Sequence, residues 1–197
     1  MTFDDIFGDR KVMAILRGMS PDETVTVAHS LWDAGVTVLE IPIGTPDAIP
    51  SLRAAAAAAH DRGLRVGAGT VITPEQVRAA AEADAQYTVA PGFDRAVLAA
   101  SQAAGMPHLP GVGSATEVQQ AWLSGCRWLK AFPAAALGPA WIAALLGPFP
   151  DVNFVATGGL TVPTASAFLN AGARVVALGA ALADPAQRNQ IADLLNP

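Results

Sequence analysis

The stretch Arg127-Trp128-Leu129-Lys130-Ala131-Phe132-Pro133 carries a short apolar run that holds a lysine near its end and is closed by a proline. Residues 127–131 lack the alternation of apolar and polar side chains that marks a strand with one face in water. Such a run is typical of a parallel strand that is covered on both faces by helices. The stretch therefore predicts an α/β protein.

The same kind of run recurs along the chain. Eight strands are expected, at residues 12–16, 36–41, 64–66, 86–89, 106–109, 127–131, 152–156 and 175–178. A capping residue followed by proline predicts helix starts at Ser20-Pro21, Thr45-Pro46, Thr73-Pro74 and Asp184-Pro185. Capping boxes are expected at Ser20/Glu23, Thr73/Gln76, Ser114/Glu117 and Asp184/Gln187.

Eight strands that alternate with eight helices favour a closed ring of strands over an open sheet. We therefore predict one domain over residues 1–197, of the α/β class, with the (β/α)8 TIM-barrel fold. A doubly wound open sheet is the rival. That fold usually carries a glycine-rich dinucleotide turn after its first strand, and Leu16-Arg17-Gly18-Met19 is not such a turn.

Composition narrows the classes of function. The net charge is -5 and no basic cluster occurs, which argues against a nucleic-acid partner. No apolar run approaches the ~20 residues of a membrane span, and residues 1–10 contain no signal-peptide core, so we expect a cytoplasmic protein without a membrane partner. Because 52% of the residues are hydrophobic and 15% are charged, we also infer a subunit interface.

Lys130 is buried if residues 127–131 form a barrel strand. An ammonium group buried without a partner is costly, and the usual escape is loss of the proton, which leaves a neutral amine. Because a neutral amine attacks ketones, Lys130 is the candidate Schiff-base residue, and its removal is not expected to strand a charged partner. A surface lysine at a strand end explains the same stretch equally well.

The functional residues of a TIM barrel gather at the rim where the strands end. Glu40 ends the second predicted strand, and its carboxylate is a candidate proton carrier. Arg17 follows the first predicted strand and could clamp a substrate carboxylate. An ion pair between Arg17 and Glu40 is an equally good explanation of both residues.

Two glycine turns follow the last two predicted strands. Thr157-Gly158-Gly159 and Gly179-Ala180 stand where barrels of this type bind phosphate with backbone N–H groups. A Gly-Gly pair also occurs in ordinary turns, so the prediction of a phosphate site depends on its position after the seventh predicted strand. The three histidines show no metal-ligand spacing, and we expect no metal site.

Seven motifs of the chain resemble, in order, those of the class I aldolases that cleave 2-keto-3-deoxy-6-phosphogluconate, its galactonate epimer and 4-hydroxy-2-oxoglutarate. They lie at residues 14–18, 39–42, 67–71, 90–92, 109–112, 129–133 and 156–159. The resemblance implies that Lys130 forms the Schiff base and that Glu40 moves protons. It implies substrate contacts by Arg17, Thr70, Pro91 and Phe132, and phosphate contacts by Thr157, Gly158, Gly159, Gly179 and Ala180.

The resemblance further implies a lyase of carbohydrate metabolism, of the Entner-Doudoroff type, that releases pyruvate from a small keto acid. It implies no metal or organic cofactor and assembly as a homotrimer. Two residues depart from the family pattern. Ala135 stands where many phosphogluconate enzymes have glutamate, and Ala180 stands where many members have a phosphate-binding serine. The sequence does not separate the gluconate branch from the galactonate branch.

Three other functions fit the sequence. An unphosphorylated 4-hydroxy-2-keto acid is the alternative substrate of an aldolase. An isomerase or decarboxylase would use the glycine turns for phosphate and Lys130 for electrostatics alone. A non-catalytic barrel that binds a sugar acid as a sensor would need no Schiff base.

Overall fold

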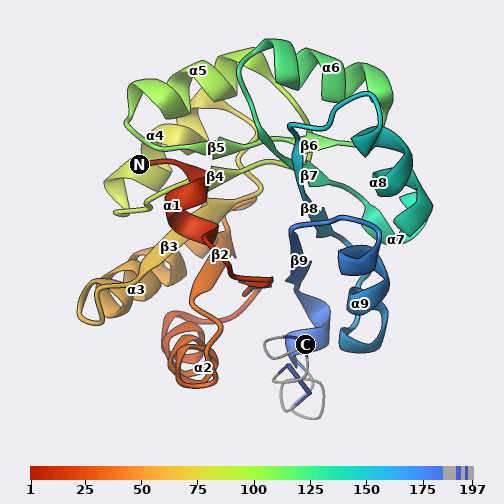
Figure 1. Ribbon diagram of the computed structural model, residues 1–197. Helices are drawn as coiled ribbons and strands as arrows, with labels where there is room; N and C mark the ends of the chain where they lie inside the picture. Colours follow the sequence, from red (N-terminus) through yellow and green to blue (C-terminus); the bar gives the residue numbers. More distant parts are fainter. Residues whose placement is uncertain (184–189, 192–193, 195–197) are drawn as a thin grey trace.

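The computed structural model describes residues 1–183, 190, 191 and 194, and Figure 1 shows its strands enclosed by helices. The strands are β1 (Val12–Ile15), β2 (Val38–Pro42), β3 (Arg65–Gly69), β4 (Thr88–Val89), β5 (His108–Leu109), β6 (Gly111–Val112), β7 (Trp128–Ala131), β8 (Asn153–Thr157) and β9 (Val175–Leu178). The α-helices are α1 (Phe3–Phe7), α2 (Pro21–Asp33), α3 (Ile49–His60), α4 (Pro74–Glu82), α5 (Arg95–Ala103), α6 (Ala115–Leu123), α7 (Ala134–Leu137), α8 (Pro139–Leu146) and α9 (Val162–Asn170). Two 3-10 helices, η1 (Pro46–Ala48) and η2 (Ala180–Ala183), complete the elements of the described part.

The described strands form one parallel sheet in the order β5-β4-β3-β2-β1-β9-β8-β7-β6. β5 lies within the fifth predicted strand, residues 106–109, and β6 continues it beyond the predicted end, after Pro110, which has no N–H to donate. β5 pairs with β4 through His108 and Thr88, whereas β6 pairs with β7 through Gly111 and Lys130. The carbonyl of Pro110 accepts a 2.8 Å hydrogen bond from the amide of Lys130. The predicted barrel is therefore confirmed, with its fifth strand divided between its two neighbours.

Local side-chain contacts explain where several helices begin. The capping boxes predicted at Ser20 and Thr73 are both present at the starts of α2 and α4. Ser114 accepts from the amide of Glu117 at the start of α6. The Glu117 carboxylate accepts from the amide of Gly113 instead of the amide of Ser114, so the predicted third box is incomplete.

Two other predicted helix starts differ in outcome. Thr45 makes no side-chain capping bond, and the chain passes through η1 before α3 begins at Ile49. The start predicted at Asp184-Pro185 and the box at Asp184/Gln187 lie outside the described residues.

The alternation of side chains along each strand divides the buried residues into two clusters. The outer cluster lies between the strands and the surrounding helices and includes Ala14, Leu39, Val66, Leu129, Phe154 and Val176. The inner cluster fills the lumen of the barrel and includes Met13, Val38, Tyr87, Trp128, Val155 and Val175. Both clusters are needed because parallel strands of this kind have no face in water.

Helix α1 closes the N-terminal end of the barrel, a feature that the sequence did not predict. Phe3 and Phe7 belong to the inner cluster, and the ring of Phe7 stacks on Trp128 with centroids 4.7 Å apart. The indole Nε1 of Trp128 donates a 3.0 Å hydrogen bond to the carboxylate of Asp4. Figure 1 shows α1 in front of the ring of strands. This closure leaves the C-terminal ends of the strands as the accessible end of the lumen.

Candidate active site

Lys130 and Glu40 point into the lumen because of their places in the strand alternation. Lys130 comes two residues after Trp128, and Glu40 comes two residues after Val38. Trp128 and Val38 both belong to the inner cluster, so the later residues face the same way. Lys130 is 5% exposed and Glu40 is 1% exposed. The surface-lysine explanation is therefore wrong for this fold.

The two charged groups meet inside the barrel. The Nζ atom of Lys130 lies 3.9 Å from Oε1 of Glu40. Among the described residues, neither carboxylate oxygen of Glu40 has a hydrogen-bond partner. A buried amine thus faces a buried carboxylate without a competing protein donor. This arrangement can pass a proton between the amine, a bound substrate and the carboxylate.

Arg17 contacts Thr70 instead of Glu40. Its Nη2 atom donates a 3.1 Å hydrogen bond to Oγ1 of Thr70, which joins the rims of β1 and β3. Thr70 has φ of 59°, a left-handed conformation that is unfavourable for a β-branched residue and typical of functional sites. No ion pair of the described residues joins Arg17 to Glu40. The guanidinium is exposed and available to a substrate carboxylate.

A cavity of about 330 Å³ opens at the C-terminal ends of the strands. Its walls include the predicted site residues Arg17, Lys130, Phe132, Thr157, Gly158, Gly159, Gly179 and Ala180. Its volume falls within the range of small-molecule sites. The fold thus brings the candidate nucleophile, the exposed cation and both glycine turns to one cavity.

Phe132 and Pro91, both predicted to contact substrate, occupy different places. The ring centroid of Phe132 lies 5.3 Å from Nζ of Lys130, and the Phe132–Pro133 peptide bond is cis. Pro91 does not belong to the cavity wall. Its carbonyl packs against Gly111, where an added Cβ would lie 2.1 Å from the Pro91 oxygen. Pro91 therefore supports the split fifth strand from the neighbouring loop.

Several apolar residues that line this cavity were not predicted from the sequence. They are Ile15, Met19, Leu160 and Ala177. The strand alternation contained a signal for Ile15 and Ala177, since each lies two residues from another member of the inner cluster. Met19 and Leu160 lie in loops, where no periodic signal exists.

The predicted phosphate end of the cavity is built on backbone turns. Gly158 and Gly159 have φ of 101° and 73°, conformations that side chains disfavour. A Cβ at Gly158 would lie 2.9 Å from the Phe132 ring, so the glycine lets this loop approach the residue beside Lys130. Ala180 begins η2, is exposed and brings no hydroxyl to the cavity wall.

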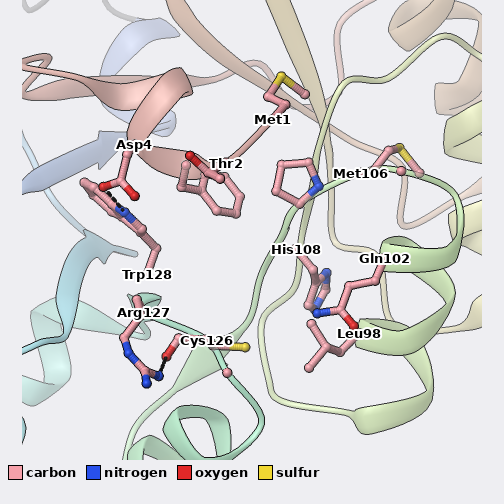
Figure 2. A pocket seen from close by; sticks show the side chains of 14 residues that line it. Met1, Thr2, Asp4, Leu98, Gln102, Met106, His108, Cys126, Arg127 and Trp128 are labelled. Atoms are coloured by element: carbon pink, nitrogen blue, oxygen red, sulfur yellow. Dashed lines mark hydrogen bonds between the residues drawn. The ribbon is translucent and has the colours of Figure 1, made fainter.

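A second cavity, of about 430 Å³, lies at the opposite end of the barrel, between α1 and the loops before β5 and β7 (Figure 2). Burial lowers the pKa of His108 to about 4 and raises the pKa of Cys126 to about 11. Both groups are therefore uncharged near neutral pH, and no lysine lines this cavity. Within the described ranges, no group of three or more His, Cys, Asp or Glu residues could hold a metal ion.

The chain is similar to known aldolases over nearly its whole length. The family model described as KDPG and KHG aldolase matches residues 3–195. A 2-dehydro-3-deoxy-6-phosphogalactonate aldolase of Escherichia coli (strain K12) is 38% identical, with 87% of this chain and 83% of that protein covered. A probable 2-dehydro-3-deoxy-6-phosphogalactonate aldolase of Rhizobium meliloti (strain 1021) is 36% identical, with coverage of 90% and 84%.

A solved structure supports the same relationship. The KDPG aldolase of Legionella pneumophila, with pyruvate captured at low pH as a covalent carbinolamine intermediate, superimposes with a TM-score of 0.83. The two sequences are 31% identical, and the match covers 96% of this chain and 92% of that structure.

Proposed function

The chain belongs to the KDPG and KHG aldolase family, and we propose that this class I aldolase, a lyase, cleaves a 2-keto-3-deoxy-6-phospho sugar acid to pyruvate and glyceraldehyde 3-phosphate. The observation that carries this proposal is the buried pair of Lys130 and Glu40, 3.9 Å apart beside a cavity of small-molecule size. The isomerase, decarboxylase and sensor alternatives do not explain why a buried amine faces that cavity.

In the proposed reaction, Glu40 takes a proton from the ammonium group of Lys130, and the neutral amine attacks the C2 ketone and gives a carbinolamine. Loss of water, with a proton supplied by Glu40, gives a protonated imine. Glu40 then removes the proton of the C4 hydroxyl, the C3–C4 bond breaks, and its electron pair moves to the imine nitrogen. The aldehyde leaves, and protonation of the enamine at C3 followed by addition of water releases pyruvate and restores the amine.

Arg17 and Thr70 are proposed to hold the keto-acid end of the substrate. The exposed guanidinium of Arg17 can pair with the substrate carboxylate, and the 3.1 Å hydrogen bond that it donates to Thr70 fixes its direction. Phe132 is proposed to cover Lys130, because its ring lies against the amine. Pro91 is proposed to act through the shape of the rim, since it does not line the cavity.

The distal phosphate is proposed to bind at Thr157, Gly158, Gly159, Gly179 and Ala180. Backbone amides at glycine turns suit an anion because no side chain keeps it at a distance. The exposed methyl group of Ala180 removes one hydroxyl donor, and Leu160 and Met19 make this part of the wall apolar. These apolar residues favour a second candidate substrate, an unphosphorylated 4-hydroxy-2-keto acid.

Pyruvate release separates these substrates. The gluconate-type and galactonate-type 6-phospho acids and their unphosphorylated analogues are each mixed with the protein, and pyruvate is followed with lactate dehydrogenase and NADH. The proposal expects the highest kcat/KM with one of the two phosphorylated epimers. Equal or higher kcat/KM with the unphosphorylated acids would assign the enzyme to the second candidate.

The assembly is proposed to be a homotrimer of one-domain chains in the cytoplasm. The support is the composition, with 15% charged and 52% hydrophobic residues, and Ile72 and Leu123, at 55% and 64% exposed, are apolar side chains that a neighbouring subunit could cover. Light scattering is expected to give three times the mass of the 20.1 kDa chain, and a monomer at micromolar concentration would refute the trimer. In the described part of the chain, no helix has the length and apolar character needed to cross a membrane.

A further inference from the structure

Strand β3 contributes glycine at two successive positions that face the lumen. Val66 and Ala68 belong to the outer cluster, so Gly67 and Gly69 face inward. A Cβ on Gly67 would lie 2.0 Å from the ring of Tyr87, and a Cβ on Gly69 would lie 1.9 Å from Oε1 of Glu40. Side chains from the two neighbouring strands therefore occupy the space that β3 leaves empty.

Tyr87 fills the lower of these two spaces. Its side chain is fully buried, precedes β4, and lies over Gly67. Its hydroxyl donates a hydrogen bond to the carbonyl of Leu39 on β2, so the residue reaches across the inner face of β3. The rings of Tyr87 and Phe3 also meet edge to face, with centroids 5.8 Å apart. The ring is thus held between the helix that closes the barrel and the backbone next to Glu40.

Glu40 fills the upper space. It is the residue after Leu39, and in the sheet register it pairs with Gly67, the glycine under the tyrosine ring. Its carboxylate lies across Gly69 and has no hydrogen bond to any described residue. Packing, together with the charge of Lys130, therefore has to fix where the carboxylate points.

We propose that Tyr87 is a positioning residue for Glu40. The Tyr87 ring packs below the Glu40 side chain and holds its carboxylate across Gly69 and toward Lys130. This inference rests on the proposed aldolase reaction, in which Glu40 moves protons. The role belongs to the ring, because the hydroxyl bonds to the Leu39 carbonyl and not to the Glu40 carboxylate.

The surroundings of Glu40 agree with this role. Among the described residues, the titratable groups found to interact with it are Lys130 on β7 and Tyr87, which precedes β4. Burial and then the negative charge of Glu40 raise the pKa of Tyr87 well above its ordinary value. Tyr87 is therefore an uncharged neighbour of Glu40. Its hydroxyl donates a hydrogen bond to the Leu39 carbonyl and leaves the Glu40 carboxylate free to act on substrate.

The test compares Tyr87→Leu with Tyr87→Phe on the best substrate of the intact enzyme. Tyr87→Leu should lower kcat by roughly 10- to 100-fold with little change in KM, because a displacement of about 1 Å in a catalytic group costs up to 10²-fold. Tyr87→Phe keeps the ring and should stay within about threefold of the wild type.

Phe7→Leu is the matched control, since it removes a fully buried aromatic ring from the same inner cluster at the end of the barrel near Trp128. It should lower stability to a similar extent and leave kcat unchanged. The inference is overturned if Tyr87→Leu keeps wild-type kcat, or if Phe7→Leu or Tyr87→Phe lowers kcat as much as Tyr87→Leu. A wild-type protein without any aldolase turnover would overturn the proposed function instead.

Discussion

The amine of Lys130 on β7 lies 3.9 Å from the carboxylate of Glu40 on β2, and these strands stand on opposite sides of the ring. The two side chains span the lumen and meet where the barrel opens to its cavity. Because both side chains are almost fully buried, water and salt screen their interaction little. The pair therefore matters for stability as well as for chemistry.

Lys130→Ala should abolish turnover and also destabilise the protein. The expectation from sequence, that this change strands no charged partner, is wrong because Glu40 lies beside the amine. Leaving one member of a buried pair alone costs about 3 to 5 kcal/mol. Urea unfolding should show this loss, and the double variant Lys130→Met with Glu40→Gln should recover most of it. Wild-type stability of Lys130→Ala would mean that the pair is not coupled in the folded protein.

Gly69→Ala should lower kcat as Glu40→Gln does. The added methyl group would lie 1.9 Å from the present position of Oε1, so the carboxylate has to move away from Lys130. Loss of general acid-base catalysis is typically worth about 10²- to 10⁴-fold, and kcat should fall within that range for both variants. Gly147→Ala, whose Cβ would meet its nearest atom at an ordinary 3.5 Å, is the control and should keep full activity. If Glu40→Gln keeps more than about a tenth of the turnover, Glu40 does not move protons.

Strand positions and the two central residues could be predicted from sequence because each leaves a local signal. Apolar runs without alternating polar residues mark buried parallel strands. Lys130 and Glu40 are ionisable residues at the ends of such runs. The division of the fifth strand at Pro110 was not predicted. It arises because the residues before Pro110 pair with β4 and those after it pair with β7. Helix α1 was missed because its five residues are too short for a periodic pattern. The contact of Tyr87 with Gly67 depends on the closure of the barrel, which no local pattern encodes.

His108 should make the protein less stable in mild acid. Its pKa is about 4 in the folded protein because of burial, against an ordinary value near 6.5, so the unfolded chain takes up the proton first. The free energy of unfolding should not depend on this group above pH ~7, and should fall by about 2 kcal/mol between pH 7 and 5. Urea titrations over this range should show the decline. The decline should be smaller in His108→Gln, and equal slopes in both proteins would contradict the buried neutral imidazole.

Ala180→Ser should improve the use of phosphorylated substrate. A hydrogen bond to a charged group contributes about 1.5 to 3 kcal/mol, so kcat/KM for the 6-phospho acid should rise about tenfold or more. The kcat/KM for the unphosphorylated analogue should not change. A rise with both substrates, or with neither, would show that residue 180 does not face the phosphate.

Reductive trapping shows directly whether Lys130 forms a Schiff base with pyruvate. The protein is treated with borohydride in the presence of pyruvate, and the product is digested and mapped by mass spectrometry. We expect one reduced pyruvate per chain, on the peptide that contains Lys130, and no adduct in Lys130→Ala. An adduct on Lys11, or turnover of substrate without any adduct, would contradict the Schiff base at Lys130.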